Sequence, residues 1–117
     1  MSVKKPQART RIRIVYGELF AIGPGKADLL EAIAETGSIS AAARRLDMSY
    51  RRAWLLIDEM NQCFREPVVG TATGGKGGGG AQITDFGRAA LREYRALERR
   101  VRTVVDKALP AFGRMLG

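Results

Sequence analysis

Residues 37–64 read GSISAAARRLDMSYRRAWLLIDEMNQCF and contain two short stretches of helical periodicity separated by a tight turn. In the first stretch, apolar residues recur at i, i+3, i+4 and i+7 from Ile39, and Ser38 precedes them as a candidate N-cap. In the second stretch, helical spacing starts at Ala53 after a candidate N-cap at Ser49. The alanines of the first stretch allow the second helix to cross it closely. The pattern therefore predicts a helix-turn-helix.

The residues before this pair predict an arm, a β-hairpin and a further helix. Residues 1–10 carry three basic residues and no acidic one, and we expect them to form a flexible basic arm. Apolar and polar residues alternate over 11–16, and a β-prone apolar run follows Gly17-Glu18 over 19–22, as in two strands joined by a Gly-X turn. Helical spacing over 26–36 ends at Gly37, because glycine readily adopts the left-handed conformation that ends a helix.

The residues after the pair predict a wing and a long helix. Two β-prone pieces flank a glycine-rich loop, which together form a wing over 67–84. Thr84 caps a helix that we expect to run over 84–109 and to stop at Pro110. Residues 11–117 are thus expected to form a single α+β winged helix-turn-helix domain, with an N-terminal β-hairpin and a long C-terminal dimerisation helix.

The composition restricts the function. The chain has 117 residues, with 20 Lys and Arg against 12 Asp and Glu, and this formal charge of +8 favours an anionic partner. It contains no His, which excludes Ser-His-Asp catalysis, and only one cysteine, which excludes internal disulfides; together these counts exclude Cys/His zinc sites. We therefore expect no enzyme, no metal and no cofactor. No apolar run approaches the roughly 20 residues that span a bilayer, so we expect a cytoplasmic protein without membrane contact.

The start of the second helix of the pair is predicted to contact double-stranded DNA. Recognition helices present their N-terminal residues to base edges in the major groove. Arg51 and Arg52 are candidates for bidentate contact with guanine, and a phosphate contact is an equal alternative for either one. Trp54 is expected to lie in the core, and a platform on which a base stacks is the less favoured alternative. The candidate DNA-binding residues are Ser38, Ser40, Arg44, Ser49, Tyr50, Arg51, Arg52, Thr73 and Lys76.

The glycine-rich loop, GTATGGKGGGG over 70–80, has two interpretations. As a wing, it permits close backbone approach to phosphates, and Lys76 supplies a charge. As a nucleotide-binding loop, it matches G-x-x-x-x-G-K, but Gly77 stands where Ser or Thr must bind Mg²⁺ and no helix follows. The sequence therefore disfavours nucleotide hydrolysis.

Apolar residues along the long helix are spaced 4-3-4-3-4, which is typical of a seam that packs on another helix. We favour a homodimer, and packing of the seam on its own domain is the alternative. An alternative function is a protein-interaction module that pairs through this helix with a different partner. The candidate dimerisation residues are Tyr94, Leu97, Val101, Val104 and Ala108.

Several of these motifs resemble the DNA-binding domain of the molybdate-responsive transcriptional regulator ModE, which is itself similar to LysR-type winged helices. The matching stretches are Gly37 to Ala43, Ser49-Tyr50 with Ala53-Trp54, Glu59-Met60-Asn61, and Ala72 to Gly80 with Thr84 and Gly87 following. The resemblance implies a homodimeric winged helix that binds operator DNA through the helix beginning at Ser49 and the wing around Lys76.

This chain departs from the family pattern at two places. Asp47 stands in the turn where the family usually has glycine, and a non-glycine residue adopts left-handed geometry less readily. ModE proteins bind molybdate through separate C-terminal domains, whereas this chain ends at Gly117. We therefore do not expect it to bind molybdate directly.

Overall fold

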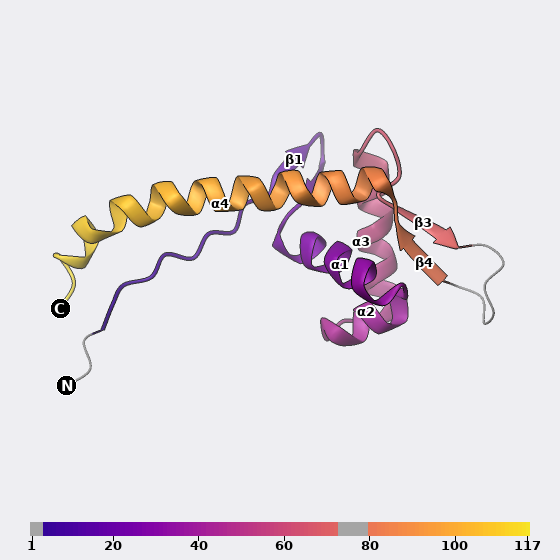
Figure 1. The fold of residues 1–117 in the computed structure, drawn as a ribbon, viewed down its shortest axis with the longest axis horizontal. Coiled ribbons are helices and arrows are strands. Elements are labelled where there is room, and N and C mark those ends of the chain that lie inside the picture. The colour runs from indigo at the N-terminus through magenta and orange to yellow at the C-terminus, as the bar shows by residue number, and fades with distance from the viewer. Residues whose placement is uncertain (1–3, 73–79) are drawn as a thin grey trace.

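The computed structural model describes residues 4–72 and 80–117, which form a winged helix-turn-helix with one long helix projecting from it (Figure 1). The elements in chain order are β1 (Ile14–Tyr16), β2 (Leu19–Ile22), α1 (Pro24–Thr36), α2 (Ile39–Arg45), α3 (Tyr50–Cys63), β3 (Val69–Ala72), β4 (Gly80–Ile83) and α4 (Asp85–Gly113). The α+β winged helix-turn-helix expected from the sequence is confirmed. None of the helices in these two ranges combines the length and the apolar character that a membrane span requires.

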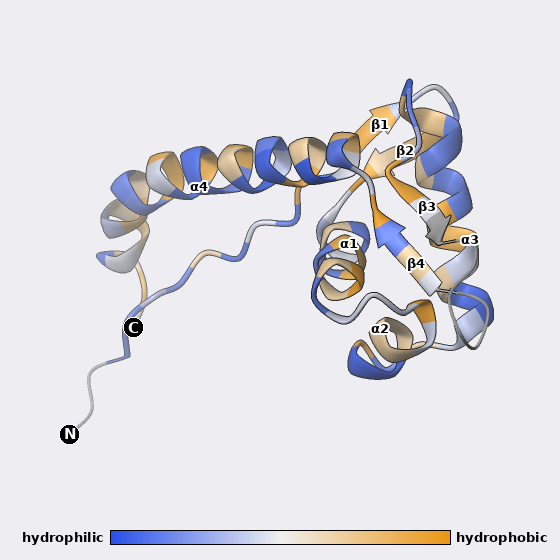
Figure 2. Cartoon of the chain, turned by 45° about the vertical axis from the view of Figure 1, so that its right-hand side comes forward, coloured by the Kyte–Doolittle hydropathy of each residue, from blue (hydrophilic) through white to orange (hydrophobic). Residues whose placement is uncertain are grey.

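The core lies where α1, α2 and α3 meet the β3–β4 pair (Figure 1). Figure 2 shows hydrophobic colouring on much of β1 and β2, mixed colouring on β4, and hydrophilic colouring on the outer side of α3. Ala42 and Ala43 are both buried, as the close crossing of α2 and α3 requires. The largest fully buried side chains are Lys26, Leu29, Leu30, Ile33, Ile39, Ile57, Met60 and Val68.

The charged member of this set, Lys26, joins three elements. Its side chain is 1% exposed, and its Nζ lies 2.9 Å from Glu59 Oε2 on α3. The same ammonium donates to the Phe20 carbonyl of β2 at 2.5 Å and lies 3.6 Å from the centroid of the Phe20 ring. A buried charge must be paired and hydrogen-bonded. Lys26 therefore fixes where α3 sits relative to α1 and β2.

The wing is attached directly to the helix-turn-helix. Strands β3 and β4 pair antiparallel, and an isolated bridge joins Ser38 to Gly80 at the start of β4. The Ala81 N–H donates to the Gly37 carbonyl at 3.4 Å, so β4 also bonds to the turn before α2. At the other end of the wing, the Asn61 side chain on α3 accepts from Val68 N–H at 2.8 Å. The root of the wing is thus held at a fixed position beside α2 and α3.

Two boundaries near the N-terminus differ from the prediction. The first strand begins at Ile14 and not at residue 11, because the Ile12 carbonyl accepts a hydrogen bond from the Tyr94 hydroxyl at 2.7 Å in place of a strand partner. Helix α1 begins at Pro24, two residues earlier than expected, with Gly23 as its N-cap. Proline suits the first turn of a helix because its missing N–H would have no partner there. The expected turn at Gly17 is confirmed by its φ of 66°.

The last helix is longer than predicted. Helix α4 continues through Pro110 to Gly113, whereas the sequence analysis placed its end before that proline. A proline removes one intrahelical hydrogen bond, to the carbonyl four residues earlier. Here the loss falls in an exposed turn, and the helix resumes with Arg114 N–H donating to the Pro110 carbonyl at 3.1 Å. With 29 residues, α4 is about 43 Å long at 1.5 Å per residue.

The described part of the basic arm runs along α4 and away from the wing (Figure 1). Residues 7–10, Glu31 of α1 and four residues of α4 line a polar cleft of about 590 Å³. Those four residues are Arg95, Glu98, Arg99 and Arg102. Near the end of the helix, Pro6 lies so close to Gly113 that an added Cβ would come within 3.3 Å of Pro6 Cγ. The arm therefore covers one charged face of α4.

Gly87 sets how closely α4 approaches the wing, and this predicts opposite effects for two glycine substitutions. A Cβ at Gly87 would lie 2.1 Å from the Val68 carbonyl oxygen, whereas one at Gly25 in α1 would meet nothing within 4 Å. We expect Gly87→Ala to lower the free energy of unfolding by about 1–3 kcal/mol through overpacking. Gly25→Ala should raise it by about 0.4–1 kcal/mol, because alanine restricts the unfolded chain. Urea denaturation measures both, and equal effects of the two substitutions would contradict the close contact.

The Lys26 ion pair gives a second stability prediction. Removing one partner of a fully buried pair costs about 3–5 kcal/mol. Because the Glu59 side chain is 33% exposed, we expect Glu59→Gln to lower the free energy of unfolding by about 2 kcal/mol. The matched control is Glu66→Gln, since Glu66 is exposed and lies 3.9 Å from Arg65. That substitution should change stability by less than about 0.5 kcal/mol in the same urea titrations. A Glu59→Gln protein as stable as the control would show that the pair does not hold α3.

Candidate nucleic-acid interface

Serine caps and left-handed residues build the helix-turn-helix. Ser38 Oγ accepts from Ala41 N–H at 3.1 Å, and Ser49 Oγ accepts from Arg52 N–H at 3.0 Å, so both predicted N-caps are confirmed. Asp47 has a φ of 54°, which shows that the turn before α3 does use left-handed geometry without glycine. The caps satisfy backbone donors that would otherwise lack partners at the start of α2 and α3.

The N-terminal turn of α3 is exposed and basic. Tyr50, Arg51 and Arg52 are all exposed, and so are Ser40 and Arg44 on the neighbouring α2. Within residues 4–72 and 80–117, the arginines at 44, 51 and 52 form no ion pair. Helix α2 lies on the side of the domain away from α4, and the wing extends beside it (Figure 1). These predicted residues therefore share an accessible cationic surface.

The other predicted contacts have different outcomes. The Ser38 hydroxyl accepts from the backbone of α2, so capping accounts for this serine. Thr73 and Lys76 lie outside the described residues. The strands that carry this loop end at Ala72 and begin again at Gly80.

Trp54 corrects the prediction that it belongs to the core. Its side chain is 36% exposed, and its ring packs edge-to-face on Tyr50 with 6.3 Å between the centroids. Helical spacing does not by itself identify this position, because the buried face of α3 is centred on Ala53, Ile57 and Met60. Trp54 lies outside that face and contributes an apolar surface beside the arginines.

Sequence reasoning also missed Asn61, which orients the wing against α3. Its Oδ1 accepts from Val68 N–H at 2.8 Å, and its Nδ2 donates to the Val69 carbonyl at 3.2 Å. An amide side chain has both a donor and an acceptor, so one residue can satisfy two backbone groups of a neighbouring strand. The motif Glu59-Met60-Asn61 contained the only sequence signal for this role.

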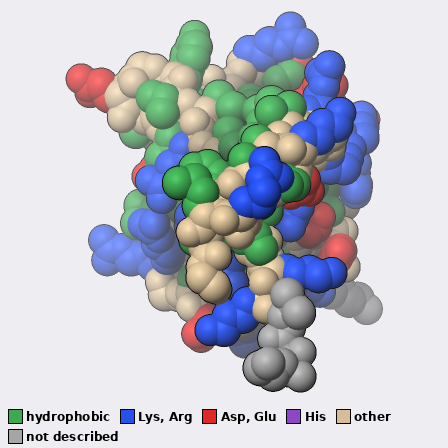
Figure 3. Space-filling model, turned by 90° about the vertical axis from the view of Figure 1, so that its left-hand side faces the viewer, with side chains coloured by type: hydrophobic (Ala, Val, Ile, Leu, Met, Phe, Trp, Pro, Cys, Tyr) green, Lys and Arg blue, Asp and Glu red, His purple; other side chains and the backbone are tan. Residues whose placement is uncertain are grey.

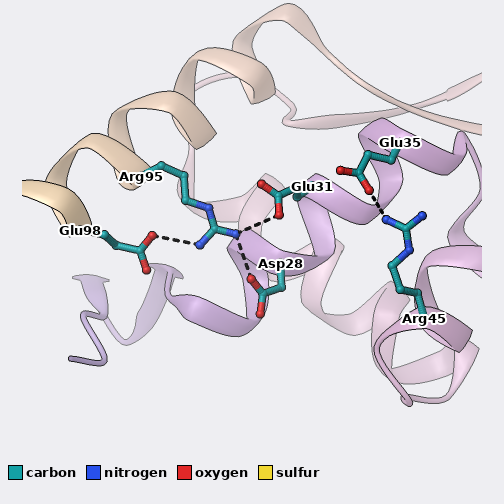
Figure 4. A network of polar contacts seen from close by, with 6 residues as sticks. All are labelled: Asp28, Glu31, Glu35, Arg45, Arg95 and Glu98. Carbon is teal, nitrogen blue, oxygen red and sulfur yellow. Dashed lines mark hydrogen bonds and ion pairs between the residues drawn. The ribbon is translucent and has the colours of Figure 1, made fainter. Parts of the chain in front are cut away.

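Arg95 ties α4 to α1 (Figure 4). Its guanidinium lies 2.9 Å from Asp28 Oδ1 and 3.5 Å from Glu31 Oε2 on α1, and 3.0 Å from Glu98 Oε1 on α4. Burial lowers the pKa of Arg95, but its hydrogen bonds to Asp28 and Glu98 outweigh burial and hold that pKa above its ordinary value. Arg95 is therefore not simply solvated, because it belongs to the contact between the two helices.

A second contact in Figure 4 ties α2 to α1. Arg45 on α2 pairs with Glu35 on α1, and both side chains are largely exposed. Arg45 is therefore neutralised locally, in contrast to the neighbouring Arg44, so the two arginines of α2 are not equivalent. Arg44 is the one that remains available to an anionic ligand.

Tyr94 corrects the set of residues proposed for dimerisation. Its side chain is 3% exposed and packs in the core of its own domain, with its hydroxyl bonded to Ile12. Burial raises the pKa of the Tyr94 phenol, so the hydroxyl keeps the proton that it donates. The part of the seam that is open to a partner therefore starts at Leu97.

The described residues contain no group of three or more His, Cys, Asp or Glu side chains that could hold a metal ion. Basic and aromatic groups define the exposed surface at the start of α3. Such a surface suits an anionic partner that presents hydrogen-bonding atoms along the edges of planar rings.

Sequence comparisons relate the chain to bacterial regulators. The family model for bacterial regulatory helix-turn-helix proteins of the lysR family matches residues 26–88. The molybdenum transport protein ModE of Azotobacter vinelandii is 40% identical over 97 residues, which cover 83% of this chain and 36% of that protein. The DNA-binding transcriptional dual regulator ModE of Escherichia coli (strain K12) is 47% identical over 77 residues, which cover 66% of this chain and 29% of that protein. The chain thus spans about a third of the length of these relatives.

A solved structure has the same fold. It is CbnR_DBD, crystallised in a complex with DNA, and it aligns with a TM-score of 0.59 at 21% identity. The alignment covers 74% of this chain and 94% of that one. The chain therefore belongs to the lysR family of bacterial regulatory helix-turn-helix proteins, and its winged helix-turn-helix is similar to the matching region of the ModE transcriptional regulators.

Proposed function

We propose that this chain is the sequence-specific, double-stranded-DNA-binding domain of a transcriptional regulator. The observation that carries the proposal is the exposed N-terminal turn of α3, where Arg51 and Arg52 have no ion-pair partner among the described residues. An arginine at the tip of a recognition helix reaches the O6 and N7 atoms of guanine in the major groove. The excess of eight positive charges supplies the affinity for phosphates that is independent of sequence.

The orientation on DNA follows from the charges along α3. Arginines occupy its first turn, whereas an exposed carboxylate, Asp58, lies two turns further on. Phosphates attract the first group and repel the second, so α3 enters the groove with its N-terminus first. Lys76, which the sequence places between β3 and β4, is proposed to contact the DNA backbone beside that groove. A regulator that binds the bacterial chromosome works in the cytoplasm.

We further propose that the protein binds DNA as a homodimer through α4. Leu97, Val101, Val104 and Ala108 form one face of this helix. The basic arm covers the opposite face, which carries Arg95 and Arg102, and so leaves the seam open. Figure 3 looks along the projecting half of α4 and shows hydrophobic side chains among Lys and Arg. Val104 is 68% exposed, which favours a second helix as its cover.

An antiparallel arrangement of the two α4 helices accounts for two further apolar surfaces. A largely apolar cleft of about 510 Å³ lies between the β1–β2 hairpin and the first half of α4, with Ile14, Phe86 and Leu97 among its lining residues. Phe112 and Met115 are exposed at or just beyond the free end of α4. In an antiparallel pair, this free end lies against the cleft of the other copy, and by two-fold symmetry both clefts are covered.

The first test uses sites selected from a random duplex pool, with and without molybdate because the names of the relatives refer to molybdenum. We expect a pseudo-palindromic site with half-sites roughly 34–36 Å apart. Arg51→Ala should weaken binding by about 1–3 kcal/mol and relax the preference at one guanine of each half-site. Lys76→Ala should weaken binding to all sequences alike, and it should reduce the slope of log affinity against log salt concentration by about one. Fluorescence anisotropy against salt concentration measures both effects.

The matched control for Arg51→Ala is Arg65→Ala, which removes the same charge from an exposed position beyond the other end of α3. Its sequence preference should equal that of the wild type. If the purified protein binds no duplex in dilute buffer, the proposed function is wrong. If Arg51→Ala keeps the wild-type preference, α3 is not the reading element.

The dimer is tested by two adjacent glutamate substitutions in α4. Val104→Glu places a charge in the seam, whereas Thr103→Glu places it on a different face of the same turn. Light scattering should show the wild type and Thr103→Glu as dimers of the 12.8 kDa chain and Val104→Glu as a monomer. Because a monomer contacts only one half-site at a time, Val104→Glu should bind the selected site about 10²-fold more weakly than the wild type. A monomeric wild-type protein would favour the alternative of a different partner for α4.

A further inference from the structure

Helix α3 carries two stripes of residues at the spacing i, i+3, i+4 and i+7. The inward stripe is apolar and buried and consists of Ala53, Leu56, Ile57 and Met60. The outward stripe, which we call the reading stripe, is exposed and consists of Arg51, Trp54, Leu55 and Asp58. Its two central residues are apolar, although a solvated helix face is normally polar.

The apolar part of the reading stripe consists of Trp54 and Leu55, and a neighbouring ring holds Trp54 in place. Leu55 is 49% exposed, and the Trp54 ring is braced by the edge-to-face contact with Tyr50. Single exposed apolar residues are common on protein surfaces, but adjacent large ones that form a patch mark an interaction site. This patch lies on the turn of α3 that follows Arg51, where a recognition helix meets base edges.

The charges around the patch indicate what covers it. Arg51 and Arg52 border it at the N-terminal end, and Arg44 is exposed on the neighbouring helix. The only acidic member of the reading stripe, Asp58, lies at its far end and accepts a hydrogen bond from Gln62 at 2.7 Å. The ligand must therefore combine an apolar group with a strongly anionic frame. The C5-methyl group of thymine, which projects into the major groove between the phosphate backbones, has this chemistry.

We infer that Trp54 and Leu55 read thymine by apolar contact with its C5-methyl group, next to the guanine read by Arg51. This inference rests on the proposed function and deepens it, because it names a second base and the residues that recognise it. The two side chains lie one helical turn beyond Arg51, which is a rise of about 5.4 Å. Base pairs are about 3.4 Å apart, so the thymine lies within two base pairs of the guanine.

Deoxyuridine in place of thymine tests this contact, since the two bases differ only in the methyl group. Each thymine of one half-site of the selected duplex is replaced in turn, and binding to the dimeric protein is measured by anisotropy. We expect a loss of about fourfold at one or two thymines within two base pairs of the guanine, because burying one methyl group stabilises by about that factor. The other thymines should show no change.

Protein variants assign the methyl contact to the reading stripe. At one of the sensitive positions, the Leu55→Ala protein should bind the thymine and deoxyuridine duplexes with equal affinity. The Trp54→Ala protein should show the same equality at that position or at the adjacent one. Leu55→Ala is the primary variant because this side chain is half exposed, and thermal unfolding checks that both variants fold. The matched control is Gln62→Ala, two turns further along α3, which should keep the full fourfold difference.

Two results would overturn the inference and leave the proposed function intact. One is that the wild-type protein selects a site but either binds the thymine and deoxyuridine duplexes with equal affinity or selects a site with no thymine near the guanine. The other is that binding still depends on the thymine methyl group in both Leu55→Ala and Trp54→Ala. The patch would then be a contact surface for a protein partner. A wild-type protein that binds no duplex would instead refute the proposed function itself, and the inference with it.

Discussion

The buried ammonium of Lys26 is the interaction on which the position of the recognition helix depends. It lies between Phe20 of β2 and Glu59 of α3, so three elements meet at one charge. An unpaired charge in a protein interior is far more costly than a lost apolar contact, and the partners of Lys26 therefore cannot be displaced. A rotation of α3 about its own axis that buried the reading stripe would also withdraw Glu59 from Lys26. The ion pair thus defines which face of α3 is exposed.

Helix α1 links the proposed DNA-binding surface to the proposed dimer surface. Lys26 on this helix holds α3, and Asp28 and Glu31 on the same helix hold α4 through Arg95 (Figure 4). At the other end of the domain, Gly87 lets α4 approach the Val68 carbonyl more closely than any side chain would permit. The angle between α3 and α4 is therefore set at two separated points. In a two-fold dimer, this angle determines the distance between the two recognition helices.

Local patterns in the sequence were sufficient for the element order but not for burial. A cap such as Thr84 is recognised from a few neighbouring residues, and the structure confirms it. Lys26 has the same helical spacing as the apolar residues of α1, but periodicity arguments count only apolar residues and so overlook a buried charge. Tyr94 belongs to the seam of α4 by its spacing, yet it packs in its own core, because a period shows which residues share a face and not what covers that face. The error at Trp54 has a different origin, because Trp54 lies outside the buried stripe of α3 and no period placed it in the core.

The composition of the reading stripe bears on specificity as well as on affinity. Contacts with phosphates strengthen binding to every sequence alike, so each further arginine on α3 would also strengthen binding to non-specific DNA. Apolar residues at Trp54 and Leu55 add no such contact, and they gain free energy only where a methyl group meets them. A guanine contact from Arg51 followed by an apolar contact one turn later, as we propose, would therefore read two bases with a single positive charge. An outward face of this composition has a lower affinity for DNA of any sequence, but it increases the difference in affinity between the correct site and all other sites.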